Sequence, residues 1–164
     1  MIGMDFGNWT IPKELWETIR PMLRPGMVTL ETGSGLSTLL LEAAGCRHTA
    51  LEHDRRFAAA SDSVVLAPLL GDPPWYDWEP PGFFDLVLVD GPPRHAGGRA
   101  GIERVIDRLV HRETVLVLDD TNRADENHLA ARLARRLGLR RTDHRTAGAR
   151  CFAVLEPVKQ VGQT

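Results

Sequence analysis

The chain of 164 residues is long enough for one domain with a sizeable hydrophobic core. Hydrophobic residues make up 43% and charged residues 26%, which excludes a disordered or fibrous composition. A formal net charge of −2 makes nucleic acid an unlikely partner, and no apolar run approaches the roughly 20 residues that span a bilayer. Two distant cysteines and a start that lacks a basic, apolar leader predict a reduced, cytoplasmic chain.

The chain opens with an amphipathic helix and then alternates strands with helices. Ile11, Leu15, Ile19 and Leu23 recur every four residues, with Thr10 as the expected cap. The later elements, in chain order, are a strand at 28–32, a helix to about 44, a strand at 48–52, a short helix at 55–60, a strand at 63–66, an irregular loop at 72–82, a strand at 84–90, a helix at 102–110, a strand at 114–118, a helix at 129–137, and strands at 139–143 and 150–155.

This alternation predicts an α/β fold, with a parallel sheet covered by helices on both faces. The last connection, at 146–148, is too short for a crossover and permits only an antiparallel hairpin. We therefore expect a mostly parallel sheet whose last strand is antiparallel. The chain divides into an N-terminal helix and lead-in at 1–24, a core at 25–157 and a tail at 158–164.

A glycine-rich loop follows the first strand and opens the next helix. Its residues are Glu31-Thr32-Gly33-Ser34-Gly35-Leu36-Ser37. Glycines let the backbone turn sharply and approach a ligand, and amides at a helix start can donate to it. Glu52 ends the second strand, where a carboxylate can accept hydrogen bonds from both hydroxyls of a ribose. The plain alternative is a tight turn capped by Ser34.

Two other nucleotide-binding loops fit less well. A dinucleotide oxidoreductase is disfavoured because Thr38 stands where a third glycine is expected, and a kinase-type phosphate loop is excluded because no lysine follows the glycines. The chain instead resembles the class I S-adenosylmethionine (SAM)-dependent methyltransferases over roughly residues 26–156. The resemblance rests on three features: the acid-x-Gly-x-Gly motif at Glu31–Gly35, the acid Glu52, and Asp90 at the end of the fourth strand.

The resemblance implies a Rossmann-like sheet of order 3-2-1-4-5-7-6 and SAM as the cofactor. By analogy with the family, Glu31 and the glycine loop hold the methionine end of SAM, and Glu52 holds the ribose. His53 edges the pocket, and Ala67 and Pro68 border the adenine. The full set of expected cofactor-binding residues is Glu31, Gly33, Ser34, Gly35, Ser37, Glu52, His53, Ala67, Pro68 and Asp90.

Three carboxylates follow neighbouring strands of the expected sheet. Asp90 ends the fourth strand, and Asp119 and Asp120 end the fifth. Carboxylates that converge repel one another unless a proton or a cation intervenes, and such oxygen-rich clusters suit Mg²⁺ or Mn²⁺. In this respect the chain is similar to metal-dependent O-methyltransferases. The alternative is that Asp119 or Asp120 caps the helix that follows.

A narrower resemblance concerns Asp90-Gly91-Pro92 and the run Asp120–Glu126, in which Arg123 stands three residues before Glu126. It is similar to the sugar-acid O-methyltransferases that act on plant xylan glucuronate. The resemblance implies a small-molecule or saccharide acceptor, and Arg99 and Arg123 would suit an anionic one. The alternative for Arg123 is a helix-surface ion pair with Glu126.

Three loop residues are further candidates. His95 is a candidate general base, or else an exposed loop histidine. Trp75 and Tyr76 lie between proline pairs and would contact the acceptor or cover the cofactor, unless they only pack against the sheet.

The leading hypothesis is O-methyl transfer, and assistance by a divalent metal is one option within it. Asp90, His95 and Asp120 are the catalytic candidates, and Asp90, Asp119 and Asp120 the metal ligands. One alternative is a non-catalytic SAM-binding partner domain, and a homo-oligomer stays open. A weaker alternative is an RNA methyltransferase that uses the arginine-rich run at 132–141, which otherwise reads as a solvated face.

Overall fold

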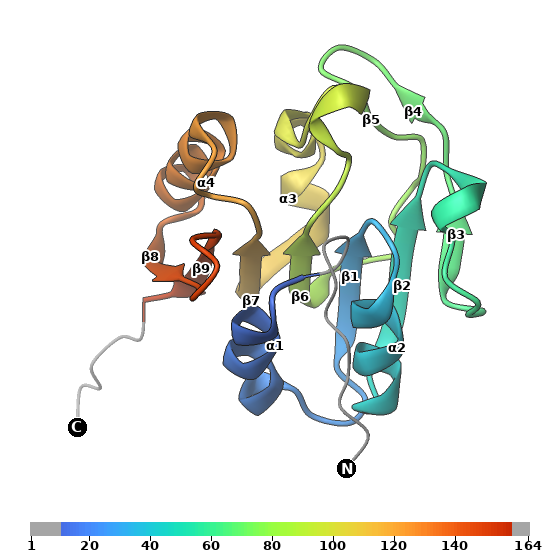
Figure 1. Cartoon of the computed structure of the whole chain (residues 1–164), viewed down its shortest axis with the longest axis horizontal. Coiled ribbons are helices and arrows are strands. Elements are labelled where there is room, and N and C mark those ends of the chain that lie inside the picture. Colours follow the sequence, from blue (N-terminus) through green and yellow to red (C-terminus); the bar gives the residue numbers. More distant parts are fainter. Residues whose placement is uncertain (1–10, 159–164) are drawn as a thin grey trace.

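The computed structural model describes residues 11–158. Its centre is a seven-stranded sheet of order β3-β2-β1-β6-β7-β9-β8, drawn in Figure 1. The strands of this sheet are β1 Val28–Thr32, β2 Arg47–Glu52, β3 Val64–Leu66, β6 Phe84–Val89, β7 Val110–Leu118, β8 Leu139–Arg145 and β9 Cys151–Pro157. Counted along the chain within this sheet, the order is 3-2-1-4-5-7-6, which confirms the expected fold class.

The strand register places the carboxyl ends of four strands at one edge of the sheet. From β3 to β7 all neighbours are parallel, whereas β9 runs antiparallel to both β7 and β8. The last paired residues are Thr32 with Leu51, Thr32 with Val89, and Val89 with Leu118. The residues that follow these strand ends therefore emerge side by side, as open α/β sheets require of a ligand site.

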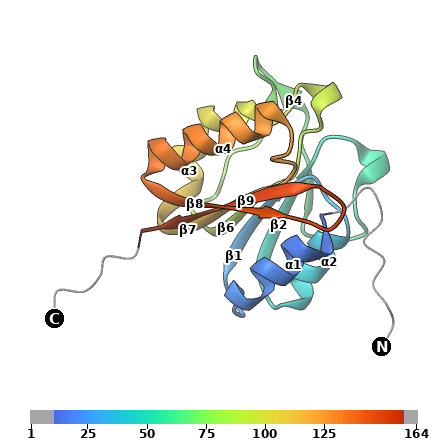
Figure 2. The same ribbon diagram turned by 60° about the vertical axis from the view of Figure 1, so that its left-hand side comes forward.

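Helices cover both faces of the sheet, and Figure 2 shows one pair on each side. The helices are α1 Lys13–Ile19, α2 Leu36–Ala43, α3 Ile106–Leu109 and α4 Ala124–Leu137. Alternate residues of β6 enter the two cores: Leu86 packs with the α1 and α2 residues, and Val87 with those of α3 and α4. Within residues 11–158, no helix combines the length and the apolar character needed to cross a membrane.

The first helix is shorter than the periodicity suggested. Pro12 directly precedes α1, and a 3₁₀ turn at Arg20–Met22 follows it. The apolar residues of the pattern still form the core, since Ile11, Leu15 and Ile19 are fully buried. The expected cap, Thr10, lies outside the described residues.

Two expected elements were wrong in their detail. The segment 72–82 is not wholly irregular, because β5 Trp75–Tyr76 pairs antiparallel with β4 Leu69–Leu70. Burial of both aromatic rings stabilises this ribbon. The helix expected at 102–110 is a 3₁₀ turn at Ala100–Arg104 and a single α-turn, because Val110 already pairs with β6 as the start of β7.

Candidate functional site

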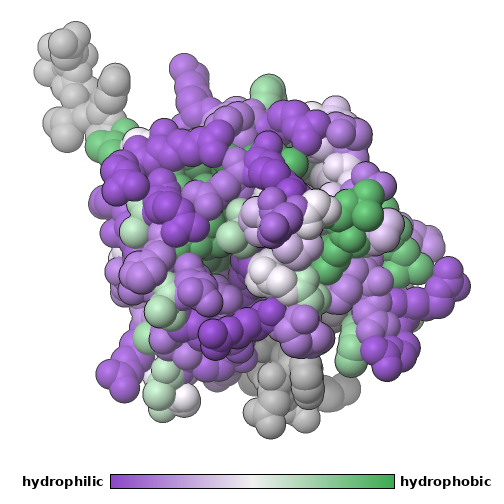
Figure 3. Space-filling model, turned by 90° about the horizontal axis from the view of Figure 1, so that it is seen from above, coloured by the Kyte–Doolittle hydropathy of each residue, from purple (hydrophilic) through white to green (hydrophobic). Residues whose placement is uncertain are grey.

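The candidate site lies at the carboxyl edge of the sheet, where the loops after β1, β2, β6 and β7 meet. Figure 3 views the molecule from this end; the surface is mostly hydrophilic, and hydrophobic residues gather toward one side. A cavity of about 310 Å³ opens here. Its lining includes Gly33, Ser34, Glu52, His53, Asp90 and His95. These six residues and Tyr76, all expected from the sequence to serve the site, are thus brought to one cavity.

The glycine loop turns sharply at Gly33. Its φ of +88° lies in the left-handed region that favours glycine, and its amide donates to the Leu51 carbonyl at 2.8 Å. This bond ties the loop to the end of β2. The backbone of Gly33 therefore lies on the cavity wall with no side chain between it and a ligand.

Glu31 holds the glycine loop in place through hydrogen bonds. Its buried carboxylate accepts hydrogen bonds from the Ser37 hydroxyl and, at 2.8 Å, from the Thr38 hydroxyl, which in turn accepts from the Gly35 amide at 3.0 Å. Glu31 and Ser37, both expected to contact the cofactor, are not among the cavity-lining residues. Thr38, which served only as evidence against a dinucleotide loop, completes this network.

Glu52 presents a prearranged carboxylate to the cavity. One oxygen, Oε1, accepts from the amides of His53 at 2.7 Å and Asp54 at 2.9 Å. Within the described part of the chain, no donor bonds to the other oxygen, Oε2. The carboxylate is therefore fixed by its own strand end and retains acceptor capacity toward the cavity.

The residues expected at the adenine edge support this wall. The Ala67 amide donates to the Glu52 carbonyl at 2.9 Å, and the Pro68 carbonyl accepts from Asp77 at 2.8 Å. Neither residue is among those that line the cavity. The sequence missed Arg56 and Phe57, which do line it and come from the 3₁₀ turn after β2.

Tyr76 reaches the cavity, whereas Trp75 does not. The Tyr76 ring is 4% exposed, and its hydroxyl has no hydrogen-bond partner among residues 11–158. A Cβ added at Gly91 would lie 2.5 Å from that hydroxyl, so the phenol reaches the loop after β6. Burial, together with the nearby charge of Glu52, raises the pKa of Tyr76. Trp75 packs edge-on against Tyr76 in the core, so its expected acceptor contact has no support in the structure.

The three carboxylates converge as expected, and arginines neutralise them. Asp90, Asp119 and Asp120 each place an oxygen within 4.8 Å of the others. Arg99, 4% exposed, lies at their centre: its Nη2 is 3.1 Å from Asp90 Oδ1 and 2.8 Å from Asp120 Oδ2. Its Nη1 donates to the Asp119 carbonyl. Arg150 pairs with the Asp119 carboxylate.

This arrangement corrects two interpretations of the sequence and bears on a third. Neither Asp119 nor Asp120 caps α4, because α4 begins at Ala124 and Arg123 precedes it without a side-chain cap. Arg123 pairs with Asp120 at 3.0 Å rather than with Glu126. Since guanidinium groups already contact all three carboxylates, a divalent cation would have to displace Arg99. Metal binding therefore stays a prediction, one that requires Arg99 to leave Asp90 and Asp120.

Two aspartates of the cluster, Asp119 and Asp90, have raised pKa values. Burial, followed by the charge of Asp90, raises the pKa of Asp119 to about 7, although Arg150 opposes this. Burial also raises the pKa of Asp90, against the effect of Arg99. Of the three aspartates, Asp90 is the one found on the cavity wall among the described residues. Asp90 is thus placed to accept a proton from a group bound there.

The free energy of unfolding is expected to fall as the pH rises from about 4 to about 7. The pKa of an aspartate in an unfolded chain is about 3.9. Between these two pH values, Asp119 therefore keeps its proton in the folded protein and has lost it in the unfolded chain. The slope contributed is at most about 1.4 kcal/mol per pH unit. Asp119→Asn, measured by urea unfolding at several pH values, should flatten this slope. Exposed Asp107→Asn should not, and equal slopes in both variants would contradict the pKa assignment.

Comparison with known proteins establishes the fold. No protein-family model matches the chain, and no curated protein sequence matches it either. A methyltransferase structure from Pyrococcus furiosus is similar, with 20% identity, a TM-score of 0.59, and coverage of 88% of this chain and 82% of that one. The 1,6-didemethyltoxoflavin-N1-methyltransferase of Burkholderia thailandensis, solved with S-adenosylhomocysteine, has 16% identity, a TM-score of 0.60, and coverage of 89% and 78%.

An O-methyltransferase is also similar. The SAM-dependent O-methyltransferase of Thermotoga maritima has 12% identity, a TM-score of 0.61, and coverage of 93% of this chain and 68% of that one. At these identities the likeness concerns the fold alone. The chain therefore has the Rossmann-like fold of SAM-dependent methyltransferases.

Proposed function

We propose that this protein binds SAM in the 310 Å³ cavity and transfers its methyl group to an oxygen of a small-molecule acceptor. The observation that carries the proposal is the Glu52 carboxylate, fixed through Oε1 and facing the same cavity as the left-handed Gly33 turn. A carboxylate at this strand end suits the two hydroxyls of a ribose. The S-adenosylhomocysteine in the similar Burkholderia protein supports the same cofactor class.

In this proposal, some residues of the cavity bind the cofactor and others accept a proton. Bound SAM would supply an activated methyl group. Glu52 accepts hydrogen bonds from the ribose, and the Gly33 backbone permits close approach of the methionine end. Asp90, whose pKa is raised by burial, takes the proton of the acceptor hydroxyl. His95, exposed at the cavity rim, is the second candidate for this proton.

Two finer expectations are not part of the proposal. Assistance by Mg²⁺ or Mn²⁺ would require the cluster to release Arg99, as described above. An anionic sugar-acid acceptor was inferred from Arg99 and Arg123, but both arginines pair with Asp120. We therefore retain oxygen methylation and leave out the metal and the acidic acceptor.

Nucleic acid has little support as a partner. Four arginines of the run at 132–141 pair with acids, so the positive charge of this surface is largely neutralised. The pairs are Arg132 with Glu103, Arg136 with Asp107, Arg140 with Glu156 and Arg141 with Asp143.

Both cysteines are free thiols, which fits the reducing cytoplasm as the proposed location.

Calorimetric titration with S-adenosylhomocysteine tests the proposal. Glu52→Gln should weaken binding by roughly 1–3 kcal/mol, because the ribose hydroxyls lose a charged acceptor. Exposed Glu79→Gln is the matched control and should bind as the wild type does. A dideoxyribose analogue should bind both the wild type and Glu52→Gln with equal affinity. Failure of the wild-type protein to bind S-adenosylhomocysteine would reject the proposed function.

A further inference from the structure

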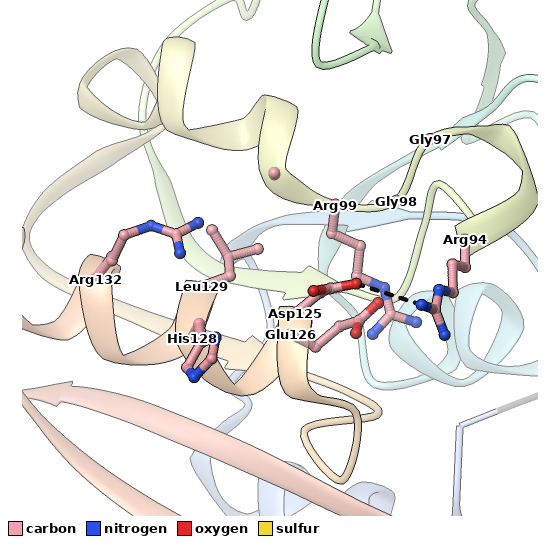
Figure 4. Close-up of a pocket in the computed structure, with 10 residues that line it drawn as sticks. Arg94, Gly97, Gly98, Arg99, Asp125, Glu126, His128, Leu129 and Arg132 are labelled. Atoms are coloured by element: carbon pink, nitrogen blue, oxygen red, sulfur yellow. Dashed lines mark ion pairs between the residues drawn. The ribbon is translucent and has the colours of Figure 1, made fainter.

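A second cavity, of about 220 Å³, lies beside the carboxylate cluster. It is bounded by the loop from Arg94 to Ala100 and by the first turns of α4 (Figure 4). Arg99 lines this cavity and also contacts Asp90, which lines the proposed cofactor cavity. The two cavities are therefore linked through one buried guanidinium group.

Glu126 is the unusual residue of this second cavity. It is 3% exposed, and its Oε2 is buried with no hydrogen-bond partner among residues 11–158. Figure 4 shows its side chain leaving α4 toward the side from which Arg99 and Arg94 approach. A buried carboxylate oxygen without a donor is costly, so this position favours the binding of a hydrogen-bond donor in the cavity.

Arg99 contributes a complementary unpaired group. Its Nε is also buried without a partner in the described part of the chain, while its two Nη atoms are engaged by the cluster. Glu126 Oε2 thus lacks a hydrogen-bond donor, and Arg99 Nε lacks a hydrogen-bond acceptor. A hydroxyl group supplies both, whereas an ammonium only donates and a carboxylate only accepts.

The charges around the cavity argue against an anionic ligand. Arg132 is held by Glu103 through two bonds of 3.0 and 2.9 Å, and Arg94 lies 3.9 Å from Asp125. Arg99 is already paired with Asp90 and Asp120. The arginines are therefore paired with acids, and no ion pair joins any of them to Glu126 within residues 11–158.

We propose that this cavity is the acceptor subsite and that it takes a neutral compound with several hydroxyl groups. One ligand hydroxyl donates to Glu126 Oε2 and accepts from Arg99 Nε. The assignment rests on the proposed function, since Arg99, which lines this cavity, contacts Asp90, the proposed base on the wall of the cofactor cavity. It adds an acceptor class, a neutral polyol, and a binding residue, Glu126.

Binding of a small set of probes tests the assignment. myo-Inositol, xylitol and methyl glucoside serve as neutral polyols, with glucuronate as the acid and glucosamine as the amine. Titrations followed by NMR, with and without S-adenosylhomocysteine, should show the strongest binding for a neutral polyol and at least a tenfold loss in Glu126→Leu. Exposed Glu113→Gln is the control and should bind as the wild type does.

A second measurement does not depend on the probe. Because Glu126 Oε2 has no partner among residues 11–158, Glu126→Gln should raise the melting temperature of the free protein by about 2–4 °C. A lower melting temperature in this variant would show a structural role and overturn the proposal. Preference for glucuronate or glucosamine, no polyol binding, or unchanged binding in Glu126→Leu would also overturn it. Polyol binding without any S-adenosylhomocysteine binding would reject the proposed function and leave the subsite standing.

Discussion

Asp90→Asn is expected to reduce methyl transfer by roughly 10²- to 10⁴-fold while leaving S-adenosylhomocysteine affinity nearly unchanged. The substitution keeps the shape of the side chain and removes its ability to take a proton. Asp90 lines the cofactor cavity, where the acceptor would react, and burial raises the pKa of its carboxyl. Asp90 is therefore the proposed base. Single-turnover rates with an identified polyol acceptor, beside calorimetric binding constants, measure the two effects separately.

The matched comparison is His95→Gln, the other proton acceptor on the cavity wall. We expect a much smaller rate loss there, because His95 is exposed at the rim. If Asp90→Asn keeps the full rate of methyl transfer and His95→Gln loses it, His95 is the general base. Binding of S-adenosylhomocysteine without methylation of any acceptor would favour the non-catalytic partner domain.

The same proteins test the metal hypothesis. Since guanidinium groups occupy the carboxylates, Mg²⁺ or Mn²⁺ should leave the melting temperature unchanged. A rise in melting temperature that disappears in Asp90→Asn would restore metal assistance.

The parts of the site that sequence predicted are those that local patterns determine. Gly33 stands between a strand and a helix, and Glu52 and Asp90 end apolar strands, so their places follow from the strand ends alone. The topology followed in the same way from the alternation of strands and helices. Once the four parallel strands are in register, these residues converge with no further information.

The parts that sequence could not predict depend on distant contacts. Arg99 lies 21 positions before Asp120, and Arg150 lies 31 positions after Asp119, with no periodic signal that joins either pair. Arg99 was expected to contact the acceptor and not these carboxylates, so a proton or a cation was the expected counter-charge. Trp75 and Tyr76 cannot be told apart from the sequence, because both are aromatic, and both are buried in the same core. Only tertiary contacts determine that Tyr76, and not Trp75, also lines the cavity.

Arg99→Met is expected to lower the free energy of unfolding by about 3–5 kcal/mol, because it leaves buried carboxylates without their central cation. Methionine preserves most of the side-chain length, so the loss reports the charge and its hydrogen bonds to Asp90, Asp120 and the Asp119 carbonyl. Urea unfolding near neutral pH measures the effect, and the loss should shrink in acid, where the carboxylates are protonated. Arg136→Met, which breaks an exposed pair with Asp107, is the control and should cost no more than about 1 kcal/mol.

Adding Asp120→Asn to Arg99→Met should recover part of the lost stability, since it removes one of the uncompensated charges that Arg99 contacts. If Arg99→Met unfolds at the same urea concentration as the wild type, the arginine does not neutralise the cluster. The carboxylates would then need another counter-charge, and a cation bound at Asp90, Asp119 and Asp120 would again be the simplest one.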